Sequence, residues 1–135
     1  MEDSFEISVV INATQKALYE AWLDSEQHSA FTGSKAQVDP QVGGSHSAWD
    51  GYIEGKILDL DPERRILQSW RTSEFPETSA DSTLDILFEE VVEGTRITLK
   101  HSQIPEGQGE SYREGWDDNY FKPLELYFSG LTHIQ

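Results

Sequence analysis

The sequence of 135 residues has no cysteine, which excludes disulfide bonds and thiolate chemistry. It is also poor in basic residues, because 10 lysines and arginines stand against 25 aspartates and glutamates, for a formal net charge of -15 at pH 7. Phosphate binding needs clustered basic side chains, so nucleic acids and anionic membranes are not expected partners. No apolar run approaches the roughly 20 residues of a membrane-spanning helix, and no membrane insertion is expected. The acidic start, Met1 to Ser4, is unlike a secretory signal, which predicts a cytoplasmic protein.

The usual signals of metal and nucleotide sites are also absent from the sequence. Gly43-Gly44 is followed neither by a Lys-Ser/Thr pair nor by a helix start, so it does not predict a phosphate-binding loop. The histidines do not form the close pairs of zinc sites, and they are His28, His46, His101 and His133. We therefore expect neither a cofactor nor a metal ion.

The first third of the sequence predicts one strand and two short helices. Residues 5–11 alternate between apolar and mostly polar side chains, which is the period of a half-buried strand. After a polar turn at residues 12–14, a helix is indicated by apolar residues on one face, namely Ala17, Leu18, Ala21 and Trp22. A second helix is expected to run to about Phe31 and to end at Gly33.

The middle of the sequence predicts about six antiparallel strands. The strongest hairpin signal is Asp50-Gly51, because these residues accept the positive φ angles of a tight two-residue turn between strands 45–49 and 52–60. A second hairpin is predicted at Glu93-Gly94. Its arms alternate with polar residues and carry Leu84, Ile86 and Phe88 on one side and Ile97, Leu99 and His101 on the other. Residues 72–82 show no periodicity and predict a loop.

The end of the sequence predicts a long helix with an aromatic face. Ser111 and Glu114 have the spacing of a capping box, and Gly130 stands where a left-handed cap would end the helix. Pro123 removes one amide hydrogen bond inside this helix, so we predict a kink near Asn119. The apolar face repeats at helical spacing and comprises Trp116, Tyr120, Leu124, Tyr127 and Phe128.

These elements together predict a single α+β domain over residues 1–135, in which a curved antiparallel sheet faces two short helices and a long C-terminal helix. Several motifs occur in a fixed order, and they are Asp39-Pro40-Gln41-Val42-Gly43-Gly44, Asp50-Gly51, Leu58 to Arg64, Ser69-Trp70, Gly94 to His101, Ile104-Pro105 and Gly115-Trp116. In this order and spacing the sequence resembles the activator of heat-shock-protein-ninety ATPase homologue family, above all the C-terminal domain of the eukaryotic co-chaperone.

The resemblance implies a helix-grip fold, as in the START lipid-transfer domains and the birch-pollen allergen, with an apolar pocket between the C-terminal helix and the sheet. Two positions depart from the family pattern. Gln41 stands where members often carry arginine, which removes an anion contact. His46 stands where members often carry phenylalanine, which makes the inner wall more polar.

The candidate residues for lining such a pocket are His46, Trp70, Phe88, Leu99, His101, Trp116 and Tyr120. The aromatic members either line a cavity or form solid core that fixes the helix on the sheet. His46 and His101 are either buried neutral side chains with a hydrogen-bond partner or polar groups that orient a ligand or act as a general base. Asp59 is either an acidic partner for them or a cap of the turn at Asp61. Trp49 stands at a pocket mouth or packs the hairpin.

Three functional hypotheses follow. The first is a non-enzymatic domain that binds a small hydrophobic molecule between the C-terminal helix and the sheet. The second is a stress-response module that docks on a chaperone of the heat-shock-protein-ninety class; since the co-chaperone's separate N-terminal domain has no counterpart in this sequence, full ATPase activation is not expected. The third is a cyclase-like enzyme with His46 or His101 as its base.

Overall fold

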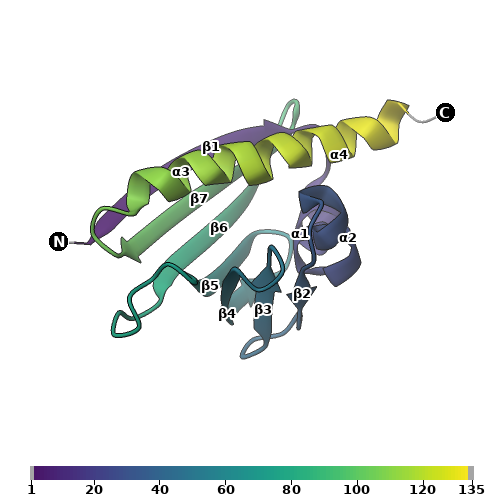
Figure 1. The fold of residues 1–135 in the computed structure, drawn as a ribbon. Coiled ribbons are helices and arrows are strands. Elements are labelled where there is room, and N and C mark those ends of the chain that lie inside the picture. Colours follow the sequence, from purple (N-terminus) through teal and green to yellow (C-terminus); the bar gives the residue numbers. More distant parts are fainter. Residues whose placement is uncertain (1, 134–135) are drawn as a thin grey trace.

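The computed structural model describes residues 2–133, which form a seven-stranded antiparallel sheet with a long helix across its inner face (Figure 1). The strands are β1 (Asp3–Ile11), β2 (Gln37–Val38), β3 (Ser45–Ala48), β4 (Ile53–Asp61), β5 (Arg65–Thr72), β6 (Ser82–Val91) and β7 (Gly94–Ile104), in the order β1-β7-β6-β5-β4-β3-β2. The helices are α1 (Gln15–Leu23), α2 (Ser25–Thr32), α3 (Gly109–Trp116), the π-helical segment η1 (Asp117–Phe121) and α4 (Lys122–His133). The predicted α+β class and helix-grip arrangement are confirmed.

The core lies between the long helix, the helices α1 and α2, and the inner face of the sheet. Both arms of the β6–β7 hairpin alternate as predicted, with their apolar residues buried and the intervening ones half-buried or exposed. The same period buries every second residue of β5, from Ile66 to Thr72. One face of each of these strands therefore packs towards the helices. This alternation fixes the register of the sheet, because a slip by one residue would move the apolar side chains to the solvent face.

The two predicted short helices are confirmed, and each begins at a side-chain cap. The Thr14 hydroxyl accepts a hydrogen bond from the Ala17 amide at 3.1 Å, and the Asp24 carboxylate accepts one from the Gln27 amide at 3.1 Å. Gly33 ends α2 with a left-handed φ of 78°. Such caps satisfy amides that have no partner within the helix.

The predicted β3–β4 hairpin is present, and its two-residue turn at Asp50-Gly51 is confirmed, because the Tyr52 amide donates to the Trp49 carbonyl at 3.2 Å. The strand pairing ends at Ala48 and Ile53, so Trp49 and Tyr52 flank the two turn residues. Trp49, Asp50 and Gly51 all have positive φ, at 55°, 56° and 89°. The left-handed backbone at Trp49 is unusual for a bulky residue, and its side chain lines the hollow described below.

The ends predicted for the long helix are wrong. Its first turn begins at Gly109 instead of at a capping box on Ser111, and the Gly109 amide donates to the Asp3 carboxylate at 2.9 Å. The cap therefore comes from the opposite end of the sequence. The helix also does not end at Gly130, because α4 continues to His133.

The π-helical segment η1 lies around Asn119, where the sequence predicts a kink. The Lys122 amide donates to the carbonyl of Asp117, five residues earlier, and Pro123 then follows without an N–H of its own. The extra residue in this turn carries Phe121 into the core, where it is 2% exposed. Prolines and π-bulges are the usual sites at which a helix bends.

Candidate functional site

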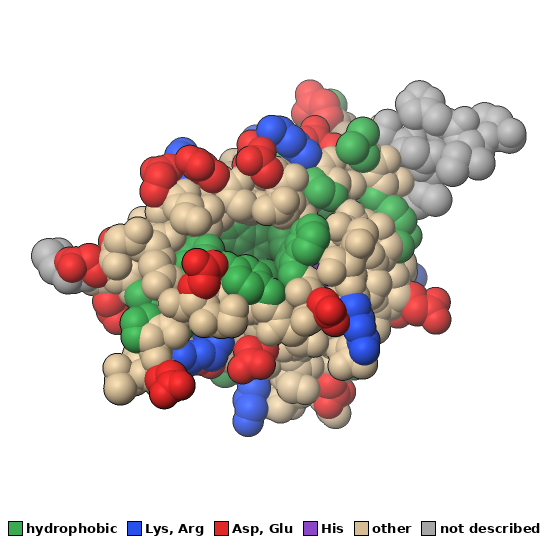
Figure 2. Space-filling view, viewed as in Figure 1, with side chains coloured by type: hydrophobic (Ala, Val, Ile, Leu, Met, Phe, Trp, Pro, Cys, Tyr) green, Lys and Arg blue, Asp and Glu red, His purple; other side chains and the backbone are tan. Residues whose placement is uncertain are grey.

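An apolar hollow opens between the long helix and the β3–β4 hairpin, with a volume of about 370 Å³. Figure 2 shows it as a recess of hydrophobic surface below the helix. Most of its lining is aromatic, and these residues are Trp49, Tyr52, Trp70, Tyr112, Trp116 and Tyr120. Of the candidates chosen from sequence, the hollow thus brings together Trp70, Trp116 and Tyr120.

The floor of the hollow is solid aromatic core. The rings of Trp116 and Tyr120 have their centroids 4.5 Å apart, and those of Trp70 and Trp116 lie 5.8 Å apart. Behind this layer, the space towards His46 and His28 measures only about 10 Å³, too little for more than a single water molecule. The sequence left open whether these aromatic residues line a cavity or form solid core, and they do both. The inner side of the layer packs as core, and its outer side bounds the hollow.

His101 lies under this floor in a hydrogen-bonded chain that joins helix and sheet. Its Nδ1 accepts from the Trp116 indole at 3.2 Å, and its Nε2 therefore carries the proton and donates to the Ser82 hydroxyl at 2.8 Å. Ser82 in turn donates to the carbonyl of Trp70. Burial lowers the pKa of His101 to about 3. With both ring nitrogens engaged and a pKa this low, His101 is a structural neutral imidazole.

A second chain runs through the other end of the floor. Trp22 accepts at its carbonyl from Nδ1 of His28 at 2.8 Å, and Nε2 of His28 accepts from the Tyr120 hydroxyl at 3.0 Å. Burial raises the pKa of Tyr120. Burial lowers the pKa of His28 to about 4. Sequence reasoning missed this role of His28, because its partners lie on two other elements, Trp22 on α1 and Tyr120 on η1.

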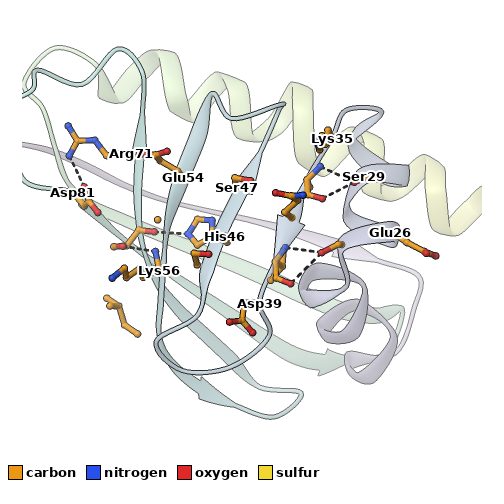
Figure 3. A pocket seen from close by; sticks show the side chains of 18 of the residues that line it. Glu26, Ser29, Lys35, Asp39, His46, Ser47, Glu54, Lys56, Arg71 and Asp81 are labelled. Carbon is orange, nitrogen blue, oxygen red and sulfur yellow. Dashed lines mark hydrogen bonds and ion pairs between the residues drawn. The ribbon is translucent and has the colours of Figure 1, made fainter.

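The side chain of His46 extends from β3 across Gly55 of β4 to the backbone of β5. Its Nε2 donates to the Ser69 carbonyl at 2.8 Å, so that the Lys56 amide bonds to the Ser69 hydroxyl instead (Figure 3). The ring occupies the place of a side chain at Gly55, where a Cβ would lie 2.6 Å from the His46 nitrogen. Burial lowers the pKa of His46. His46 stands behind the floor and does not line the hollow.

The remaining candidates lie away from the hollow. Phe88 packs edge-on against Tyr19 of α1, and Leu99 is fully buried in the centre of β7. Asp59 is exposed at a β-bulge, where it accepts from the Leu60 amide and lies 3.9 Å from Arg65, so it is not a partner of either histidine. The bulge turned its side chain outward, and the alternation rule could not foresee it.

Beside the hollow, hydrogen bonds join the β3–β4 loop, the end of β5, the β5–β6 loop and the start of α3. Tyr52 donates to the carboxylate of Glu74, and the Glu74 amide donates to the Thr72 hydroxyl. That hydroxyl lies 2.7 Å from the hydroxyl of Tyr112. Gln108 closes the network, since it donates to the Glu74 carbonyl and accepts from Tyr112. Tyr112 has the same helical spacing as Trp116 and Tyr120, a signal that sequence reasoning missed.

A larger concavity of about 1210 Å³ lies between α2, β2 and the outward faces of β3 to β5 (Figure 3). Its charged groups have both signs. The Arg71 guanidinium is already paired with Asp81 at 2.7 Å. Apolar side chains also line it, among them Ala36, Val38 and Leu58, and His46 stands on its wall, so it is an open surface groove of mixed character. Its labelled charged residues are Glu26, Lys35, Asp39, Glu54, Lys56, Arg71 and Asp81.

The chemistry that these sites can perform is recognition by shape and stacking. Within residues 2–133 no group of three or more His, Asp or Glu side chains is placed to hold a metal ion. In the same part of the chain, no helix is long and apolar enough to cross a membrane. His28, His46 and His101 each have a lowered pKa and a hydrogen-bonded ring, and none of the three lines the hollow, where a general base would have to stand.

Comparison with protein families gives one match over most of the chain. Residues 12–129 match the model of the family described as Activator of Hsp90 ATPase homolog 1-like protein. The human protein named Activator of 90 kDa heat shock protein ATPase homolog 1 is 30% identical over 111 residues. That match covers 82% of this chain but 32% of the human protein, so the chain spans about a third of the length of this curated relative.

Solved structures agree with the sequence match. The structure titled an HSP90 activator from Plasmodium falciparum has a TM-score of 0.83 at 27% identity and covers 93% of this chain and 96% of that one. A protein from Mesorhizobium loti superposes with a TM-score of 0.79 over 94% of this chain and 97% of its own, at 18% identity, which shows the fold alone.

Proposed function

The chain belongs to the Activator of Hsp90 ATPase homolog 1-like protein family, and we propose that it is a non-enzymatic domain that binds a small apolar molecule in the hollow between the long helix and the β3–β4 hairpin. The observation that carries this proposal is the aromatic lining of a cavity of about 370 Å³. Ligand sites of small molecules are concave, mostly apolar and of at least roughly 300 Å³. Trp70, Trp116 and Tyr120 are the proposed contacts at its floor.

The rigidity of the floor supports binding in a preformed site. Trp116 and Tyr120 are tied to buried histidines by hydrogen bonds, and they are 3% and 4% exposed. Their rotamers are therefore fixed before any ligand arrives. A ligand that meets fixed rings does not bear the entropy of ordering them, which is an advantage that preorganised sites have over flexible ones.

The neutral histidines favour binding over catalysis. His101 and His46 do not line the hollow, and each ring is hydrogen-bonded, His101 through both nitrogens and His46 through Nε2. A general base must come within hydrogen-bond reach of the proton that it removes. A molecule in the hollow would meet indole and phenol rings instead of these imidazoles.

The test is to fill the hollow without disturbing the helix. Gly115 lines the hollow from α3, and a Cβ there would meet no atom closer than 3.7 Å, so Gly115→Leu should fold. Glu114→Leu places the same side chain on the exposed face of the same helix as a matched control. We expect native mass spectrometry of the purified protein to show a retained small molecule that Gly115→Leu loses and Glu114→Leu keeps.

Titration with 1-anilinonaphthalene-8-sulfonate or naphthalene probes, followed by tryptophan fluorescence, gives a second readout for the three proteins. Binding that is equal in all three would remove the hollow as the site. No retained molecule together with no probe binding to the unmodified chain would remove the proposal.

A second function is favoured by the relatives. The human relative and the Plasmodium protein are both named as activators of Hsp90, and we propose that this chain docks on a chaperone of that class. Sedimentation of the chain with the Hsp90 of its own organism, with and without ATP, tests it. Co-sedimentation is the expected result, and unchanged sedimentation of both proteins at concentrations of about 100 µM would contradict docking at any affinity typical of co-chaperones.

A further inference from the structure

We propose that the hollow selects a cationic ligand, namely a flat apolar group that carries a protonated or quaternary amine. This inference rests on the proposed function, because it concerns the same hollow. It adds the sign of the charge that the ligand carries, which neither the family nor the fold specifies.

The first argument is the chemistry of the lining. The aromatic residues of the hollow are tryptophans and tyrosines, whose ring faces carry a negative electrostatic potential. A cation above such a face is attracted, and the attraction grows when the site excludes water. Three indoles, those of Trp49, Trp70 and Trp116, come together here, and indole is the side chain with the strongest effect.

The second argument is the position of the nearest charges. All ten lysines and arginines lie within the described residues 2–133, and none of them lines the hollow. The carboxylate of Glu74 does not itself line the hollow, but it accepts the hydrogen bond of Tyr52, which does. Burial and then this bond raise the pKa of Tyr52 to about 12, and the charge of Glu74 also helps to raise the pKa of Tyr112. An anionic ligand would lose its hydration here without meeting a positive partner.

The third argument is that Glu74 is held in place. Its amide donates to Thr72 at 3.1 Å, and its carbonyl accepts from Gln108 at 3.1 Å. The loop and the start of the long helix therefore present the carboxylate from a fixed backbone. Figure 2 shows both acidic and basic side chains around the recess, and over the whole sequence the acidic ones are in excess, with a net charge of -15. A cation would meet favourable potential from the rim down to the floor.

The test compares three probes of one shape with different charge. They are 2-naphthylmethylamine, which is protonated at pH 7, the neutral 2-naphthalenemethanol, and the anion 2-naphthoate. Isothermal titration calorimetry is run on the full chain at about 50 mM salt and again at about 500 mM salt. We expect the amine to bind about tenfold more tightly than the naphthoate, with the alcohol between them, and the difference to shrink at high salt.

Two variants locate the effect. Glu74→Gln keeps an acceptor for the Tyr52 hydroxyl but removes the negative charge. We expect this variant to bind the amine about threefold more weakly, or weaker still, and to bind the alcohol with unchanged affinity. Glu90→Gln makes the same change of net charge at an exposed position of β6 outside the hollow. It should leave the affinities for the amine and for the alcohol unchanged. If naphthoate binds as tightly as the amine, or if the two variants have equal effects on binding of the amine, the proposal of charge selection is overturned. The proposal that the hollow binds an apolar molecule would then still stand. Failure of all three probes would overturn both proposals.

Discussion

The indole nitrogen of Trp116 donates a hydrogen bond to Nδ1 of His101 across 3.2 Å, from the long helix to the inner face of β7. Both side chains are buried, at 3% and 1% exposure. The bond sets the tautomer of His101, because a nitrogen that accepts cannot carry the proton. It also sets the position of the helix along the sheet, since only one placement brings an indole N–H over this ring. The floor of the hollow is built on this contact.

Loss of the Trp116 indole should be costly for stability. Trp116→Phe leaves the buried Nδ1 of His101 without a donor and opens a small cavity, and we expect a loss of about 2–4 kcal/mol in the free energy of unfolding. Urea denaturation measures it. In a His101→Leu background the same substitution should cost at least about 1 kcal/mol less, because the bond is already gone. Strictly additive effects would show that the two side chains are not coupled.

The stability of the fold should fall as the pH is lowered from neutral. His28 and His101 have folded-state pKa values of about 4 and about 3, whereas both titrate near 6.5 in the unfolded chain. Below pH 6.5 the unfolded state binds more protons, so the stabilisation is complete above that pH and is lost as the pH falls towards 4. Between pH 7 and 5.5 each histidine should cost about 1 kcal/mol, and His46 acts in the same direction.

Urea unfolding at pH 7 and pH 5.5 checks this, with His28→Phe as the comparison protein. The phenylalanine has a similar ring and cannot bind a proton, so the loss of stability between the two pH values should shrink by about 1 kcal/mol. An unchanged difference would mean that His28 is not the neutral, buried group of the folded state.

Gly55 and Gly115 provide a matched pair of glycine substitutions. A Cβ at Gly55 would lie 2.0 Å from the backbone carbonyl of Ser69, whereas one at Gly115 would meet no atom closer than 3.7 Å. Gly55→Ala should therefore destabilise by about 3 kcal/mol or more, and Gly115→Ala, inside α3, should stabilise by about 0.5–1 kcal/mol. Thermal unfolding distinguishes them, and similar melting temperatures for the two variants would contradict the placement of His46 across Gly55.

The first turn of α3 should depend on Asp3 and be insensitive to Ser111. The Asp3 carboxylate accepts from the amides of Gly107 and Gly109 at 3.0 and 2.9 Å. Asp3→Ala should cost about 1 kcal/mol and speed amide hydrogen exchange at Gly109. Ser111→Ala should stay within about 0.5 kcal/mol of the unmodified chain. A larger loss of stability for Ser111→Ala than for Asp3→Ala would contradict the cap by Asp3 and support the capping box that the sequence pattern indicated.

Much of the fold was predictable because its signals are local. The alternation in β1 and in the β6–β7 hairpin, the capped helices α1 and α2, and the apolar spacing of Trp116, Tyr120 and Leu124 each lie within a few residues of sequence. The capping box at Ser111 was wrong although its signal is also local, because a distant group, the Asp3 carboxylate, accepts from the first amide of the helix instead.

The sequence by itself determined the class of fold, the absence of cysteine chemistry, the acidic surface and which faces of each element are apolar, because composition and periodicity carry that information. Only the tertiary structure decided where the aromatic residues stop being core and start to bound a hollow. That boundary depends on contacts between Trp49, Trp70 and Trp116, which come from a hairpin loop, a strand and a helix. It also depends on the hydrogen bond from Tyr52, which lines the hollow, to Glu74. Such contacts join residues far apart in sequence, and no pattern within one segment encodes the distance between two segments.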